Sequence, residues 1–135
     1  MKIILEVLPS EKMRYNTQGD WFLDEKGNLI IQSIECENCF YEFLVLVHEL
    51  VECLDCMKRG VSQKQVDDFD FVCKADDPGS ESDAPYNRSH RLATGIENIL
   101  AAAWGIDWKK YESSLEMSSQ NLPENPKCQT PINPS

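Results

Sequence analysis

The stretch from residue 40 to residue 59 most constrains the fold, because it has no glycine or proline and is apolar around most of a helix. Its broad apolar face consists of Phe40, Phe43, Leu44, Val47, Leu50, Val51 and Leu54, and Val45, Leu46 and Cys53 fill most of the remainder. Asn38 is a suitable N-cap, and Gly60 can adopt the left-handed conformation that ends many helices. We therefore predict one long helix that lies centrally in the fold rather than on its surface.

The same helix carries the segment His48-Glu49-Leu50-Val51-Glu52, which combines two candidate metal ligands with a candidate base. Residues four apart stack on one face of a helix, so His48 and Glu52 can bind the same cation. Glu49, one step around the helix, can then activate a metal-bound water, following the logic of the H-E-x-x-H metalloprotease helix. A buried Glu52 without a partner costs several kcal/mol, and a bound metal removes that cost.

His90, the only other histidine in the chain, is the natural third ligand. Two histidines and one carboxylate form a catalytic zinc donor set that leaves a coordination position for water. Thr94 and Glu97 lie on the same side of the helix expected around His90, so either can orient its imidazole. Asp55, three residues after Glu52, faces either this site or solvent.

The third ligand has an alternative. His90 lies between Arg88 and Arg91 near an expected helix start, where it can instead be an exposed residue that binds no metal. In that case Asp68 and Asp70 are the next candidate oxygen donors.

Three short segments predict a small sheet. Residues 2–8 have the pattern of a mostly buried strand that ends before a proline. Residues 21–23 and 29–34 flank a polar loop in which Gly27 and Asn28 supply left-handed positions, which is typical of a β-hairpin. We expect an antiparallel or mixed sheet with one face to be covered.

Two further helices are predicted after the central one. Ser62-Gln63-Lys64-Gln65 has the pattern of a capping box, which opens a helix that reaches about Lys74. A third helix begins at Asn87 or Ser89 and continues to about Trp104.

These elements predict an α+β fold in which a small three-stranded sheet packs on the central His-Glu helix and two further helices complete the structure. Residues 1–112 are expected to form a single domain. The prolines near the C-terminus predict a flexible tail over residues 113–135.

Over residues 1–105, a small sheet, a His-Glu helix and a downstream ligand helix resemble the zincin fold of small metal-dependent peptidases. The resemblance implies that His48 binds zinc and that Glu49 polarises a water and shuttles its proton. Glu52 stands where the usual motif has a second histidine, and His90 also departs from that family's third ligand. A carboxylate at this position makes the site more tolerant of Mn²⁺ or Fe²⁺. The short, acidic chain is also similar to small proteins encoded by phages or prophages.

The function expected from these features is a metal-dependent hydrolase with a peptide or small-molecule substrate and Zn²⁺, or another divalent ion such as Mn²⁺, as cofactor. The net charge of −10 argues against direct nucleic-acid binding, which needs clustered lysine and arginine. The acidity serves solubility or attracts a cationic partner. The alternative function is therefore a non-catalytic acidic interaction or inhibitor protein that binds a basic or nucleic-acid-binding partner.

Neither a transmembrane run nor a secretory h-region is present in the sequence, so we expect a cytoplasmic protein without membrane contact. Reduced thiols are expected in that compartment. Cys36, Cys39, Cys53 and Cys56 form two C-x-x-C pairs whose spacing is close to that of a structural zinc site. In a continuous helix, however, Cys39 and Cys53 lie about 21 Å apart, so both cannot bind one zinc. The structural zinc protein is the less favoured alternative.

Overall fold

A mixed three-stranded sheet forms one layer of the structure, which is a computed structural model that describes residues 1–126. The strands are β1 (Ile3–Leu8), β2 (Gly19–Leu23) and β3 (Leu29–Ile34), in the order β1-β3-β2. The central strand β3 is parallel to β1 and antiparallel to β2, which confirms the predicted hairpin. In the hairpin loop Gly27 has a φ of 77°, but no other residue there has a positive φ, so the prediction for Asn28 was wrong.

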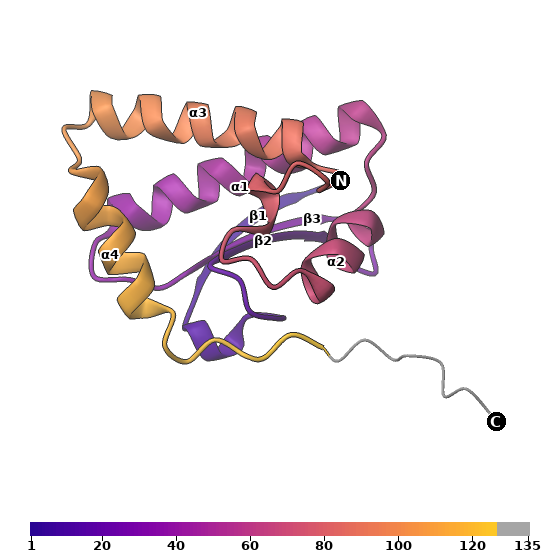
Figure 1. Cartoon of the computed structure of the whole chain (residues 1–135), viewed down its shortest axis with the longest axis horizontal. Coiled ribbons are helices and arrows are strands. Elements are labelled where there is room, and N and C mark those ends of the chain that lie inside the picture. The colour runs from indigo at the N-terminus through magenta and orange to yellow at the C-terminus, as the bar shows by residue number, and fades with distance from the viewer. Residues whose placement is uncertain (127–135) are drawn as a thin grey trace.

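The long helix α1 (Cys39–Arg59) covers one face of the sheet, as Figure 1 shows. Both of its ends are formed by the predicted residues. Asn38 accepts a hydrogen bond from the backbone N–H of Phe40, and Gly60 ends the helix with a φ of 75°. These caps satisfy backbone groups that a helix end otherwise leaves unpaired, so α1 begins and ends where the local sequence provides for it.

Two of the remaining helices also agree with the sequence. The helix α2 (Gln63–Val72) opens with the predicted capping box between Ser62 and Gln65, and it ends two residues before Lys74. The helix α3 (Asn87–Ala103) follows and lies alongside α1, with the opposite chain direction (Figure 1). This packing brings the middle of α1 next to the first half of α3. Two single-turn 3₁₀ helices, η1 (Ser10–Lys12) and η2 (Pro78–Ser80), interrupt the loops.

A fourth helix, α4 (Trp108–Ser118), was missed by the sequence analysis. Asp107 caps it by accepting a hydrogen bond from the backbone N–H of Lys110. Tyr111 and Leu115, one turn apart, are buried in an apolar cluster with side chains of α1, α3 and β3. The folded part therefore continues past residue 112, and the predicted tail boundary at residue 113 was wrong. The last part of that predicted tail, residues 127–135, lies outside the described residues.

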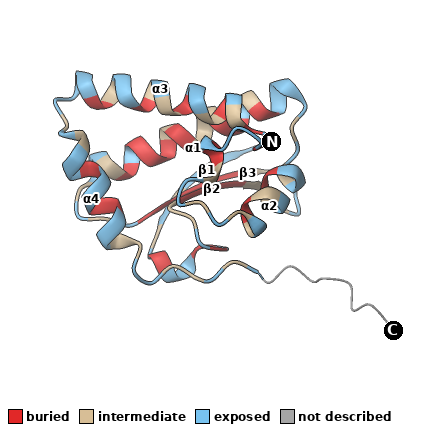
Figure 2. Cartoon of the chain, viewed as in Figure 1, coloured by how far each residue is buried: buried red, intermediate tan, exposed pale blue. Residues whose placement is uncertain are grey.

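Burial is concentrated between the sheet and α1 (Figure 2). All six residues of β3 are buried, because this strand is central in the sheet and lies beneath the helix. The α+β class and the three-stranded sheet on a central helix are thus confirmed, with three further α-helices in place of two. Among the helices of residues 1–126, none combines the length and apolar character needed to cross a bilayer.

Candidate metal centre

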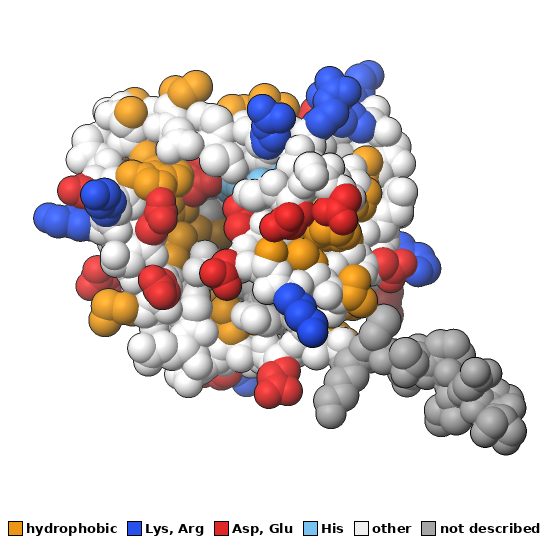
Figure 3. Space-filling view, in the orientation of Figure 1, with side chains coloured by type: hydrophobic (Ala, Val, Ile, Leu, Met, Phe, Trp, Pro, Cys, Tyr) orange, Lys and Arg blue, Asp and Glu red, His pale blue; other side chains and the backbone are white. Residues whose placement is uncertain are grey.

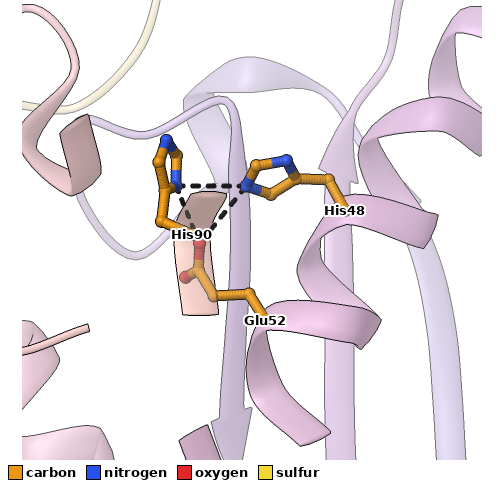
Figure 4. A group of neighbouring side chains, drawn as sticks. All are labelled: His48, Glu52 and His90. Carbon is orange, nitrogen blue, oxygen red and sulfur yellow. Dashed lines mark hydrogen bonds and ion pairs between the residues drawn. The ribbon is translucent and has the colours of Figure 1, made fainter. Parts of the chain in front are cut away.

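Three side chains from α1 and α3 point their polar atoms at one another (Figure 4). The Nε2 atom of His48 lies 3.2 Å from Oε2 of Glu52 and 3.2 Å from Nδ1 of His90. The same Nδ1 atom of His90 lies 2.9 Å from Oε2 of Glu52. The structure therefore brings together all three residues that the sequence analysis selected as metal ligands.

These separations fit a small metal ion. Four ligands at about 2.0–2.1 Å in a tetrahedron lie about 3.3 Å from each other, which is close to the observed spacing of the three atoms. The group is largely shielded from water, with exposed side-chain fractions of 11% for His48, 6% for Glu52 and 14% for His90. The alternative in which His90 is an exposed residue is therefore wrong.

In each of the two imidazoles, the ring nitrogen that faces away from the cluster contacts a carboxylate. The Nδ1 atom of His48 lies 2.7 Å from Oε1 of Glu97, whose other oxygen accepts a hydrogen bond of 2.6 Å from the hydroxyl of Tyr111. The Nε2 atom of His90 lies 3.3 Å from the carboxylate of Asp77. Such outer acceptors are typical of metal-binding histidines, because they orient the ring and leave the other nitrogen free for the metal.

Glu52 is also held by a group outside the cluster. Its Oε1 atom accepts a hydrogen bond of 3.2 Å from the indole N–H of Trp21, in strand β2. The oxygen that faces the histidines is the other one, Oε2. All three candidate ligands thus have one polar atom fixed from outside and one directed at the common centre.

Only some of these outer residues were predicted from the sequence. Glu97 was expected to orient His90 but instead contacts His48, and Thr94 has no side-chain hydrogen bond to either histidine in residues 1–126. Asp77 was missed because it lies in a polar loop with no helical spacing to His90. Tyr111 was missed together with its helix, although the four-residue spacing of Tyr111 and Leu115 was the available sign of α4.

The inward-facing atoms need positive charge between them, from protons or from a metal ion. When His48 donates its Nδ1 proton to Glu97 and His90 donates its Nε2 proton to Asp77, the two inward nitrogens carry lone pairs. They then meet a carboxylate oxygen at 2.9–3.2 Å with no hydrogen between the three acceptors. Either protons or a metal ion must compensate the repulsion.

The pKa values of both histidines are raised, which shows that this centre favours positive charge. Burial lowers the pKa of His48, but its hydrogen bonds to Glu52 and Glu97 outweigh this and raise the pKa to about 11. Burial acts in the same direction on His90, whose hydrogen bonds to Asp77 and Glu52 raise the pKa to about 9. A metal ion must therefore displace protons from this centre, and its binding should strengthen as the pH rises.

Glu49 lies next to this centre but has a different environment. It makes no side-chain hydrogen bond or ion pair within residues 1–126, and it packs against Gly19 of β2, where an added Cβ would lie 2.6 Å from Oε1 of Glu49. Burial, followed by the negative charge of Glu52, raises the pKa of Glu49 well above its ordinary value. An unpaired carboxylate with a raised pKa is a candidate for proton transfer.

A cleft of about 1240 Å³ gives access to the centre. His48, Glu49, Glu52 and His90 line it together with residues of β2, the loop before α3, and α4. On this face of the molecule, apolar side chains lie inside a hollow, acidic side chains surround it and a histidine is visible within (Figure 3). The arrangement combines a cation site, a free carboxylate and space for a substrate.

The alternative oxygen donors have other partners. Asp68 pairs with Lys64 on the surface, and Asp70 accepts hydrogen bonds from the hydroxyls of Tyr15 and Tyr86. Asp55 accepts hydrogen bonds from Arg59 and Ser89 and does not contact Glu52. None of these three carboxylates belongs to the cluster.

The cysteine alternative also disagrees with the structure. Cys39 and Cys53 belong to one continuous helix, and Cys53 and Cys56 are buried in the apolar core. Within residues 1–126, the group of side chains with metal-ligand geometry includes no cysteine. The structure therefore speaks against the structural zinc alternative, which the helix geometry had already disfavoured.

Gly79 offers a specific test of how His90 is positioned. A Cβ atom at Gly79 would lie 2.5 Å from Cγ and Nδ1 of His90, so Gly79→Ala must displace the imidazole. We expect a loss of metal affinity of about 10–100-fold, the usual effect of disturbing a ligand's orientation, measured by competition with a chromogenic chelator. Gly95→Ala on α3 is the matched control, since nothing lies within 4 Å of its added Cβ. Equal affinities for the two variants would contradict the role of His90.

No protein-family model matches this chain, and no curated protein or solved structure is significantly similar to it. The functional assignment therefore depends on the geometry and chemistry of the site. The resemblance to zincins, which the sequence suggested from its layout and His-Glu motif, stays a prediction.

Proposed function

We propose that this protein is a metal-dependent hydrolase in which His48, Glu52 and His90 bind the metal and Glu49 is the general base. The observation that carries the proposal is the convergence of three buried acceptor atoms at 2.9–3.2 Å. Each ligand is fixed from outside, so the chain holds the three atoms at a spacing that a metal ion can occupy once it displaces the histidine protons.

The proposed reaction uses Glu49 for proton transfer. A divalent ion at the site would polarise a substrate carbonyl and lower the pKa of a water. Glu49 accepts a proton as the water oxygen attacks the carbonyl carbon, and it then delivers that proton to the departing amine nitrogen as the C–N bond breaks. The raised pKa of Glu49 favours the first half of this transfer, because a carboxylate with a raised pKa is a stronger base than an ordinary one.

Zn²⁺ is the ion that best suits the donor set. Two imidazole nitrogens and one carboxylate oxygen are a known catalytic zinc combination that leaves room for water. Mn²⁺ is the second candidate, because a carboxylate ligand makes the site harder. We further propose a zincin-like architecture, since the His-Glu helix packs on a small mixed sheet and its third ligand comes from a later helix.

The charge of the cleft indicates the kind of substrate. Asp76, Glu112 and Glu116 line it and make no side-chain hydrogen bond or ion pair within residues 1–126. Lys74 is the only lysine or arginine among the described lining residues. An acidic cleft attracts positively charged ligands, so we propose a peptide with lysine or arginine near the cleaved bond as the substrate class.

A second function is favoured by the same acidic rim. A non-catalytic protein with these carboxylates would bind a basic partner and block it, as the net charge of −10 suggests. Binding of that kind would weaken strongly with salt and would not depend on Glu49, because Glu49 lies inside the cleft rather than on its rim. The hydrolase is preferred, since an interaction surface alone does not require three converging metal-ligand atoms.

Metal analysis and a peptide assay test the proposal together. We expect one metal ion per chain after loading with Zn²⁺ or Mn²⁺ at pH 8, measured by elemental mass spectrometry. Cys36→Ala should retain the ion, since Cys36 is not part of the cluster. The loaded protein should cleave a fluorogenic library with a preference for basic peptides, and chelation should abolish this activity reversibly. Absence of metal in every loaded sample would contradict the hydrolase and favour the acidic binding protein.

A further inference from the structure

The side of α1 that faces away from the cleft carries a second apolar surface, which is largely exposed. Six residues define this apolar stripe, which has no charged member: Phe40, Phe43, Val47, Leu50, Leu54 and Met57. Four of the six are exposed, with exposed fractions of 52% for Phe40, 43% for Phe43, 47% for Leu54 and 47% for Met57. The sequence predicted that a helix so apolar would be central, yet within residues 1–126 this side is covered only in part. The ring of Phe40 lies 5.8 Å from that of Trp104 at the end of α3, and Leu50 packs against the apolar core.

The spacing of the apolar stripe fits a second helix as the element that packs on it. Its members follow one another at intervals of three, four, three, four and three residues. This is the a/d pattern of a helix seam, in which apolar side chains repeat every 3.5 residues on average and interlock with a second helix. The covering element is therefore expected to be a helix that runs along the length of α1.

Strand β1 extends the same surface. It is an edge strand, and Ile3, Leu5 and Val7 are exposed by 52%, 54% and 38%. The parallel register places Leu5 beside Ile31, which is buried in the apolar cluster beneath α1, so these exposed side chains are on the helix-covered face of the sheet. An exposed apolar edge strand is a ready site for pairing with another strand.

The apolar stripe and β1 also lie on the same side of the molecule. Successive helix residues are 100° apart, so Leu50 and Leu54 are nearly opposite Glu52 around α1. Glu52 faces the cleft and accepts its hydrogen bond from Trp21 of β2, which is the other edge of the sheet. The stripe consequently faces the β1 edge, away from the candidate metal centre.

We propose that this surface joins two copies of the chain in a two-fold symmetric dimer. The β1 strands pair antiparallel to give one continuous six-stranded sheet, and the two α1 helices pack together through their apolar stripes. One two-fold axis provides a partner for both the apolar stripe of α1 and the free edge of β1, because it brings each element against its own copy.

Charge complementarity supports a second copy as the occupant. Antiparallel pairing centred on Ile4 places Lys2 opposite the partner's Glu6 on one face, twice per dimer, and Ile3 opposite the partner's Leu5 on the other. Neither Lys2 nor Glu6 has an ion pair within residues 1–126. Two chains of net charge −10 repel each other over most of their surface, so a contact face without unpaired carboxylates is required. The clefts stay open in such a dimer.

The test is the oligomeric state of the full chain, measured by analytical ultracentrifugation at micromolar concentrations. We expect a mass of twice 15.5 kDa. Leu54→Glu should raise the dimer dissociation constant by at least about 100-fold, since it places two charges in the seam. Met117→Glu is the matched control, because Met117 is 71% exposed on α4 and lies outside the stripe. Circular dichroism checks that each variant is folded.

Charge reversal then tests the strand register. Lys2→Glu should weaken the dimer, and the double variant Lys2→Glu with Glu6→Lys should restore it, because the two charges exchange places across the axis. A monomeric wild-type chain, or a dimer that Leu54→Glu leaves intact, would overturn the proposal. A Lys2→Glu variant that dimerises as tightly as the wild type would overturn the β1 register. These outcomes do not depend on whether the protein is a hydrolase.

Discussion

Replacing Glu49 with glutamine is expected to lower kcat by about 10²–10⁴-fold, the usual contribution of a general base, while the metal content stays unchanged. Glutamine has the same shape as glutamate but cannot accept the proton of the attacking water. The binding of substrate should change little, so KM is expected to stay within a few-fold of the wild-type value. Steady-state kinetics and elemental mass spectrometry on the same preparation measure both quantities.

Glu42→Gln is the matched control for this change. Glu42 is another glutamate on α1 and is buried, but it accepts a hydrogen bond from the backbone N–H of Cys36, outside the cleft. Its variant should keep full activity. A Glu49→Gln enzyme that retains wild-type kcat would exclude Glu49 as the base, even if the metal site is correct.

Glu49→Gln should also stabilise the metal-free protein. The carboxylate has no hydrogen-bond partner in residues 1–126, and burial together with the charge of Glu52 disfavours its ionised form. A neutral amide removes that repulsion. A rise in Tm accompanied by loss of activity would identify a residue that is kept for chemistry rather than for stability.

Replacing His48 with alanine is expected to have the largest effect on both metal binding and folding. The variant should lose the bound ion, because only two of the three ligands, Glu52 and His90, would remain. It should also lose about 3–5 kcal/mol of unfolding free energy, the usual effect of removing one member of a buried charged pair. The reason is that Glu52 and Glu97 both contact His48 and would be left without it. Urea denaturation and elemental analysis measure the two losses.

A double variant separates the loss of unfolding free energy from the loss of metal binding. When Glu97→Gln is combined with His48→Ala, one of the two carboxylates that contacted His48 is replaced by a neutral amide. Part of the lost unfolding free energy should then return, without any recovery of metal binding. Glu97→Gln alone should weaken metal binding about 10–100-fold, because it perturbs the group that orients the imidazole. A His48→Ala protein that keeps its metal and its stability would show that the site has been placed wrongly.

The local features of the fold follow from the sequence, whereas its long-range contacts do not. The bounds of α1, the capping box of α2 and the β2–β3 hairpin were predicted because caps, helical periodicity and turn residues act over a few neighbouring positions. The alignment of His48, Glu49 and Glu52 on one helix follows from the same local geometry. The sequence by itself therefore determined the helix that carries the candidate site and two of its three ligands.

Only the tertiary structure decided how the site is completed. Glu97 contacts His48 rather than His90, although Glu97 and His90 belong to the same helix, because α3 packs across α1 and offers its side chains to both histidines. Asp77 and Trp21 reach the cluster from separate segments, and no spacing rule connects these to the ligands. The largely exposed side of α1 is likewise a matter of packing. Hydrophobic periodicity predicts that a helix face will be buried. Whether that face is covered by the same chain or by another one depends on how whole elements pack.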